Sequence, residues 1–156
     1  SDPVCPKFAE SLAAAGEAAG GRVHRKGTYV CIEGPQFSTR AESLLYRSWG
    51  VSVIGMTAMP EAKLAREAEL PYSVLALATD YDCWHASGEA VTADAVVQVM
   101  KKNVDVAKRA LVALAKTLPD PKTCLGPGAL STAIMTAREA MHGDAKQKLS
   151  WLLGEK

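Results

Sequence analysis

Two aspartates separated by one residue lie just beyond an apolar run near the middle of the chain. Residues 74–78 are apolar, and Asp80 and Asp82 follow them. In an extended chain residues i and i+2 point to the same side, so both carboxyl groups would meet at the end of a buried strand, where ligands collect in α/β folds. Two like charges held close raise the proton affinity of one of them, which suits general acid catalysis. The alternative is a turn in which both aspartates are solvated.

A second candidate site is the stretch 55–61, between a predicted strand and a predicted helix. The backbone N–H groups, the Thr57 hydroxyl and the helix dipole at this point would favour an anion such as phosphate. The alternative is that Thr57 only caps the helix.

Phe37 is the third candidate, because it follows a Gly-Pro turn and lies outside any periodic apolar stripe. An aromatic ring on a loop can stack on a planar base. The alternative is that Phe37 lies in the core. Arg40 and Glu42 carry no predicted chemistry and read as a structural ion pair or helix-surface charges.

The elements that must position these groups alternate along the chain. Apolar spacing predicts helices at 8–19, 39–49, 61–70 and 92–114, the last with a stripe of Val96, Met100, Val104, Ala107, Leu111 and Leu114. Strands are predicted at 23–32, 51–54 and 72–79, and the last, apolar without alternation, is predicted to be central in its sheet. This order indicates an α/β fold, followed by a tail with a loop at 126–128 and one or two short helices.

Bulk properties exclude several classes of protein. The chain has 156 residues and a net charge of +1, with no basic stripe for nucleic acid, no segment long enough to span a membrane and no signal peptide. The four cysteines form no C-x-x-C pair, so a metal site is not expected. We interpret them as reduced, mostly buried thiols of a cytoplasmic protein, with disulfides as the alternative. The N-terminus reads as the middle of a domain.

Several stretches occur in one family in this order. The chain resembles the C-terminal half of 5′-methylthioadenosine phosphorylases, in the trimeric purine nucleoside phosphorylase superfamily. The resemblance rests on Cys5-Pro6-Lys7, Gly27-Thr28, Glu33-Gly34-Pro35-Gln36-Phe37-Ser38-Thr39-Arg40-Ala41-Glu42, Met56-Thr57, Met59-Pro60-Glu61 and Thr79-Asp80-Tyr81-Asp82-Cys83-Trp84. It implies a three-layer α/β/α fold with a mixed central sheet. Residues 1–118 would form the C-terminal half of that domain, and 119–156 a loop and short helices packed on it.

The resemblance also implies roles for single residues. Such enzymes cleave methylthioadenosine with phosphate to adenine and 5-methylthioribose 1-phosphate, with phosphate as co-substrate and no metal or organic cofactor. Asp80 and Asp82 match the purine-binding set. From their pairing we hypothesise that Asp80 would hydrogen-bond to or protonate N7 of the purine, and that Asp82 would hold its 6-amino group. Thr57 would bind phosphate. The substrate-binding set is Phe37 beside base and sugar, Met56 under the ribose, Ser38, Ile54, Gly55 and Thr79 near the base or sugar, and Val91, Val96 and Val97 around the methylthio group.

Two positions favour adenine over a 6-oxopurine. Related 6-oxopurine enzymes carry a Glu after the Phe and an Asn after the Thr, where this chain has Ser38 and Asp80. An ionised carboxylate only accepts hydrogen bonds, so it suits a 6-amino group and repels a 6-keto oxygen. A buried acceptor facing another acceptor costs on the order of 1–3 kcal/mol.

The family's glycine-rich phosphate loop and Arg-His phosphate contacts have no match here. We therefore expect a second chain to supply the N-terminal half, in a homotrimer of such pairs. Two alternatives stay open: a broader purine nucleoside phosphorylase, and a purine-binding fragment without catalysis.

Overall fold

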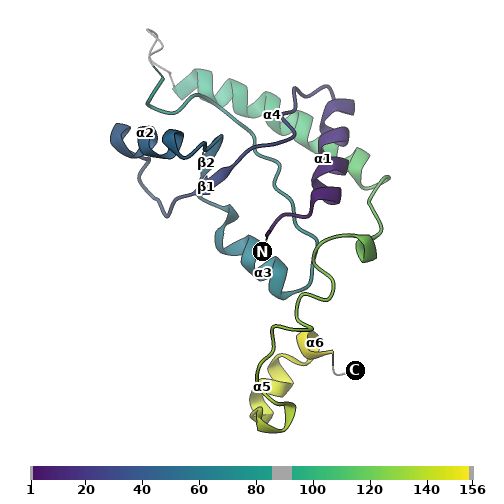
Figure 1. Cartoon of the computed structure of the whole chain (residues 1–156). Coiled ribbons are helices and arrows are strands. Elements are labelled where there is room, and N and C mark those ends of the chain that lie inside the picture. The colour runs from purple at the N-terminus through teal and green to yellow at the C-terminus, as the bar shows by residue number, and fades with distance from the viewer. Residues whose placement is uncertain (1, 86–92, 155–156) are drawn as a thin grey trace.

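The computed structural model describes residues 2–85 and 93–154. Helices and strands alternate in its first two thirds, and short helices follow in the tail (Figure 1). The elements are α1 (Pro6–Ala18), β1 (Tyr29–Cys31), α2 (Arg40–Ser48), β2 (Val53–Gly55), α3 (Ala58–Glu67), α4 (Ala93–Leu114), the 3-10 turns η1 (Pro121–Thr123) and η2 (Arg138–Ala140), α5 (Gly143–Lys148) and α6 (Ser150–Leu153). The α/β class is confirmed.

Strands β1 and β2 are parallel and are joined by α2, as a parallel pair requires a crossover. Tyr29 pairs with Val53 and Cys31 with Gly55, and the Ile32 N–H extends the ladder by donating to the Gly55 carbonyl at 2.9 Å. Both strands are shorter than predicted. Within the described residues the sheet has only these two strands, so its mixed order stays a prediction.

The predicted central strand at 72–79 is wrong for the described part of the chain, which has no strand there. The segment is held at its two ends instead. The Tyr72 carbonyl accepts from the Cys5 N–H at 2.8 Å, and the Ala78 carbonyl accepts from Asn103 Nδ2 at 2.8 Å. A strand needs a neighbouring strand for its ladder, and local sequence does not say which strand that is.

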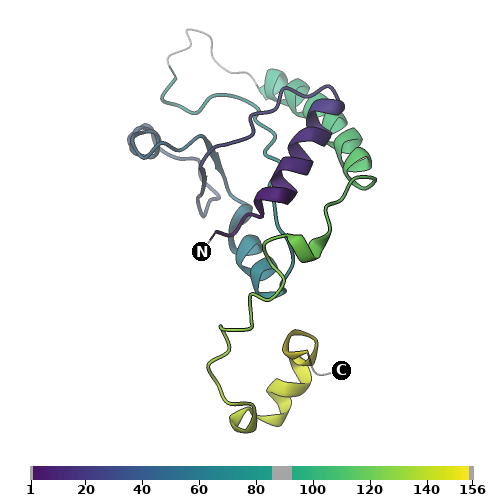
Figure 2. The ribbon, with the colours of Figure 1, turned by 45° about the vertical axis from the view of Figure 1, so that its right-hand side comes forward.

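The core lies between α1 and the second half of α4, which cross in both views of the ribbon (Figures 1 and 2). Its buried members are Leu12, Ala15, Ala110 and Leu114. The stripe predicted for α4 is therefore only partly correct. Met100 and Leu111 are 45% and 56% exposed, because α1 packs on the strip of α4 that carries Ala110 and Leu114. Met100 lies before that strip, and Leu111 lies beside it.

Two backbone N–H groups at the base of the tail donate hydrogen bonds to side chains of the body. Leu125 N–H donates to Cys5 Sγ at 3.2 Å, and Leu130 N–H donates to Glu69 Oε1 at 2.8 Å. Beyond them α5 and α6 contact each other and project from the body (Figure 2). This differs from the expected packing of the tail helices on the body, while the boundary at residue 118 stays a prediction. Among the described helices, none has the length and apolar composition of a membrane span.

Candidate functional site

The start of α2 is fixed by a reciprocal capping interaction. The Thr39 hydroxyl accepts from the Glu42 N–H at 3.3 Å, and the Glu42 carboxylate accepts from the Thr39 N–H at 2.7 Å. This pattern satisfies two backbone donors that a helix N-terminus otherwise leaves unpaired. It assigns Glu42 a capping role in place of an ion pair, and it positions Ser38 and Phe37 immediately before the helix.

Asp82 docks on this helix. Its Oδ2 accepts from the hydroxyl of Ser43 at 2.5 Å, and its Oδ1 accepts from the Cys83 N–H at 2.8 Å. The Ser38 hydroxyl lies 3.4 Å from both carboxylate oxygens. Ser43 is only 1% exposed, so its hydroxyl has been taken out of water and directed at the carboxylate. The segments around residues 38–43 and 82–83 therefore form one hydrogen-bonded unit.

The hydrogen bonds decide the charge of Asp82. Burial alone would raise the pKa of this carboxyl, but the donors outweigh it and hold the pKa of Asp82 below its ordinary value. Those donors are the Ser43 hydroxyl, the N–H and thiol of Cys83, and the Ser38 hydroxyl. Donors aimed at a carboxylate favour its charged form. The surroundings of Asp82 therefore favour its ionised form.

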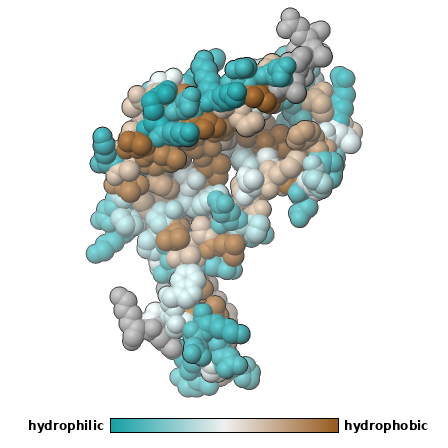
Figure 3. All heavy atoms as spheres, turned by 180° about the vertical axis from the view of Figure 1, so that it is seen from behind, coloured by the Kyte–Doolittle hydropathy of each residue, from teal (hydrophilic) through white to brown (hydrophobic). Residues whose placement is uncertain are grey.

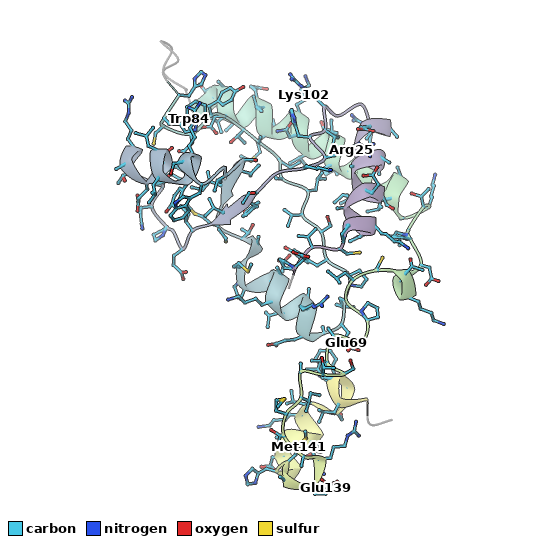
Figure 4. All side chains as sticks on the ribbon, viewed as in Figure 1. Arg25, Glu69, Trp84, Lys102, Glu139 and Met141 are labelled. Carbon is cyan, nitrogen blue, oxygen red and sulfur yellow. The ribbon has the colours of Figure 1, made fainter. Side chains whose placement is uncertain are left out.

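Aromatic contacts pin the rest of the loop that follows Asp80. The Arg47 guanidinium lies 3.7 Å from the ring centroid of Trp84, a cation–π contact, and Figure 4 shows Trp84 beside α2. The rings of Tyr81 and His85 stack at 4.5 Å. Arg47 lies four residues after Ser43, so both project from one face of α2. This face of α2 therefore holds the loop at Asp82, through Ser43, and at Trp84, through Arg47.

Asp80 has a different environment from Asp82. It is exposed, and its Oδ1 accepts from the Thr79 hydroxyl at 2.5 Å. The two aspartates follow the apolar segment as predicted, but Asp82 turns to α2 while Asp80 bonds to its own neighbour. The predicted rise of one carboxyl's proton affinity does not occur at Asp82, because hydrogen-bond donors surround it.

A cleft of about 320 Å³ opens beside the segment that leads from β1 to α2. Phe37 lines it and is 86% exposed, so the alternative that Phe37 lies in the core is wrong. Ser38 also lines the cleft and joins it to Asp82. The lining residues are Val30, Cys31, Ile32, Glu33, Gly34, Gln36, Phe37, Ser38, Glu42 and Tyr46.

The residues around the end of β2 approach the same region. A Cβ built on Gly34, whose φ is +73°, would lie 2.8 Å from Met56 Sδ, so the Met56 side chain lies against the turn before Phe37. Gly55 is covered by the Tyr29 ring, and a Cβ there would meet the Tyr29 hydroxyl. Ile54 is half-buried and pairs with Val30.

Thr57 precedes α3, and its side chain makes no capping hydrogen bond. It is exposed. The alternative was that the Thr57 hydroxyl only caps the helix, and this is wrong, because the hydroxyl accepts no hydrogen bond from the first turn of α3. The hydroxyl is therefore available to a ligand.

The predicted methylthio pocket is described in part. Val91 lies outside the described residues, while Val96 is half-buried and Val97 is 41% exposed on α4. Among residues 2–85 and 93–154, no group of three or more His, Cys, Asp or Glu side chains could hold a metal ion.

Sequence reasoning missed Ser43 and Arg47. A serine in an amphipathic helix and an arginine in its last turn give no signal of a distant partner. The available hint was their spacing of four residues on the helix that follows Phe37.

Comparisons with known proteins point to one family. Residues 1–116 match the family described as the phosphorylase superfamily. An S-methyl-5′-thioadenosine phosphorylase of Geobacter sulfurreducens is 51% identical over 99% of this chain and 54% of its own length. The crystal structure of a methylthioadenosine phosphorylase from an antarctic soil metagenomic library superposes with a TM-score of 0.84 and 47% identity, over 97% of this chain and 54% of that one.

A Schistosoma mansoni methylthioadenosine phosphorylase in complex with adenine superposes with a TM-score of 0.67 and 32% identity, over 77% of this chain and 48% of that one. The chain thus spans about half the length of the relatives that it matches. Its sequence and its fold agree on one assignment: the chain belongs to the phosphorylase superfamily.

Proposed function

We propose that this chain supplies the purine, ribose and methylthio pocket of an enzyme that cleaves 5′-methylthioadenosine with phosphate. The products are adenine and 5-methylthioribose 1-phosphate. The observation that carries the proposal is the Asp82 carboxylate, which Ser38 and Ser43 hold at the edge of the cleft that Phe37 lines. Relatives 46–51% identical to the chain are named S-methyl-5′-thioadenosine phosphorylase.

The two aspartates would divide the chemistry at the base. Asp82, kept ionised, accepts a hydrogen bond from the 6-amino group of adenine. The long 3.4 Å contacts from Ser38 are the ones that the amino group can replace. Asp80, exposed at the end of its segment, donates a proton to N7. The first role needs an ionised carboxylate, which accepts only, and the second needs a carboxyl that carries a proton when the purine leaves.

The reaction then balances as a displacement at the sugar. The bond between C1′ and N9 breaks, and its electron pair goes to the purine, where the proton from Asp80 neutralises the charge at N7. A phosphate oxygen forms the new bond to C1′, partly positioned by Thr57. General acid help of this kind supplies about 10²–10⁴ in rate. The reaction needs no metal or organic cofactor.

The rest of the phosphate site would come from an N-terminal half, carried by a second chain, in a trimer of such pairs. The surface of this chain supports a covering partner. Trp49, Leu111 and Val112 are 63%, 56% and 63% exposed, and apolar patches run across the rear of the body (Figure 3). Apolar surface of this extent marks an interaction site.

Phosphate-dependent release of adenine tests the proposal. The natively purified protein, with every chain that copurifies, is incubated with methylthioadenosine with and without phosphate, and adenine is separated and measured. Adenine release only with phosphate supports the function. A natively assembled, folded protein that binds methylthioadenosine without releasing adenine overturns it in favour of the purine-binding fragment.

Adenosine is the second candidate substrate, because several similar structures, all from Schistosoma mansoni, are named adenosine/methylthioadenosine phosphorylase. The ratio of kcat/KM for the two nucleosides separates a strict enzyme from a broader one. Inosine serves as the control for base recognition, and we expect it to react at least about tenfold more slowly.

A further inference from the structure

Two cysteines distant in sequence meet where the segment after α4 returns to the start of α1. Cys5 precedes the first residue of α1 and is 1% exposed. Cys124 directly follows η1 and is half-buried. The Leu125 N–H donates to Cys5 Sγ at 3.2 Å, which brings the neighbouring Cys124 beside Cys5, and each of the two thiols shifts the pKa of the other. Of the four cysteines, only Cys5 is buried, so the expectation of mostly buried thiols is wrong.

The backbone around this pair is seated closely. The Cys5 N–H donates to the Tyr72 carbonyl at 2.8 Å. Gly126 has a φ of +148°, and a Cβ there would lie 2.8 Å from the Leu70 carbonyl carbon. Three segments, at residues 5, 70–72 and 124–126, therefore converge, and the two sulfur atoms lie at their junction.

The pKa values of the two thiols are shifted in opposite directions. Burial raises the pKa of the Cys5 thiol, but donors from the backbone of Phe8, Leu125 and Lys7 and from the Cys124 thiol together lower it. Burial and the hydrogen bond to Cys5 raise the pKa of Cys124. Cys5 lies at a helix N-terminus, a position that favours a thiolate. The surroundings of Cys5 therefore favour its thiolate more than the surroundings of Cys124 favour theirs.

We propose that Cys5 and Cys124 are a reversible oxidation site, which closes to a disulfide when a hydroperoxide reaches Cys124. The Cys124 thiol first loses its proton to solvent; the resulting thiolate attacks the hydroperoxide oxygen, and the O–O bond breaks. This step yields Cys124 sulfenic acid and, once the leaving oxygen takes up a proton, an alcohol or water. The Cys5 sulfur then displaces the hydroxyl group from Cys124 and loses its proton, and water leaves. The dithiol gives up two electrons and two protons, and the hydroperoxide is reduced.

The disulfide would fasten the base of the tail to the start of α1. It touches none of the residues assigned to the purine site, so it acts on the fold and its test needs no turnover. We expect the oxidised protein to unfold at a higher temperature than the reduced protein, since the bond closes a long loop.

Peptide mapping of the natively purified protein tests the site. The protein is reduced, freed of reductant and treated with a small excess of hydrogen peroxide. It is then alkylated and digested without reduction. We expect a cross-linked peptide that joins Cys5 to Cys124, a chain lighter by about 2 Da before alkylation, and the loss of two of the four alkylatable thiols. Treatment with dithiothreitol is expected to restore the two lost thiols and the original mass.

Cys31 provides the matched control, because it is half-buried like Cys124. The C31S variant is expected to form the same cross-link, and C124S none. A peroxide-treated wild type without the cross-linked peptide overturns the proposal, whether Cys124 stays reduced, goes to sulfinic acid or pairs with Cys83.

Discussion

Ser43 offers the sharpest test of how the site is held. Its hydroxyl is 1% exposed and donates to Asp82 Oδ2 at 2.5 Å. A hydrogen bond to a charged group contributes about 1.5–3 kcal/mol. Ser43→Ala removes it and leaves Asp82 with the Cys83 N–H and the two long Ser38 contacts. If this energy is used to hold the carboxylate against the purine, kcat/KM for methylthioadenosine falls by about 10–150-fold.

The matched control lies on the same helix. Ser48 is exposed and its hydroxyl donates only to the Leu45 carbonyl, at 2.7 Å. We expect Ser48→Ala to change kcat/KM less than about twofold. The assay measures initial rates of adenine release on the native assembly of each variant, with folding checked by circular dichroism. Equal kcat/KM for Ser43→Ala and Ser48→Ala would refute the positioning role.

Acid stability gives a second readout that is independent of turnover. The folded pKa of Asp82 is depressed, so its contribution to stability is present above the unfolded value of about 3.9 and is lost as pH falls through the folded value. Ser43→Ala moves the folded pKa back toward 3.9. Thermal unfolding between pH 5 and pH 2 should therefore show a stability advantage of wild type over the variant at pH 5 that shrinks as the pH falls. Parallel curves for both proteins would contradict the cause assigned to the shift.

Three further substitutions probe the surroundings of the site. Arg47→Ala removes the cation–π contact with Trp84, worth about 0.5–1 kcal/mol, and should raise KM for methylthioadenosine about two- to fivefold with kcat retained; a fall in kcat alone would argue against it. Gly55→Ala should destabilise the fold by about 1–3 kcal/mol through the Tyr29 hydroxyl, and Tyr29→Phe should recover part of that in thermal unfolding. Phe37→Ala should leave unfolding unchanged, because the ring is 86% exposed, yet raise KM about two- to tenfold; an unchanged KM would remove Phe37 from the site.

Local signals were sufficient for the helices. Thr39 and Glu42 carry the spacing of a capping box, and the structure confirms the start of α2 there. For Phe37 the sequence left a loop and a core position open, and the structure places its ring outside the core. The capping box depends on residues within one turn of each other, so the printed order of the chain contains all the information that it needs.

Features that depend on residues distant in sequence could not be predicted from local patterns. The segment 72–79 reads as a strand, but strand pairing depends on a partner, and within the described residues its backbone is held by Cys5 and Asn103. The apolar stripe predicted for α4 is only partly covered, because periodicity reveals a face and not how much of it a neighbour covers. Met100 and Leu111 are the residues left exposed.

The sequence by itself determined the α/β class, the family and the residue types of the candidate site, because these rest on local periodicity and on motifs in fixed order. Only the tertiary structure decided that Asp82 is held by Ser43 while Asp80 stays exposed, and that the thiols of Cys5 and Cys124 meet. Each depends on side chains 39 or more residues apart. A charge state is set by the donors around a carboxyl in space, and no spacing along the chain specifies them.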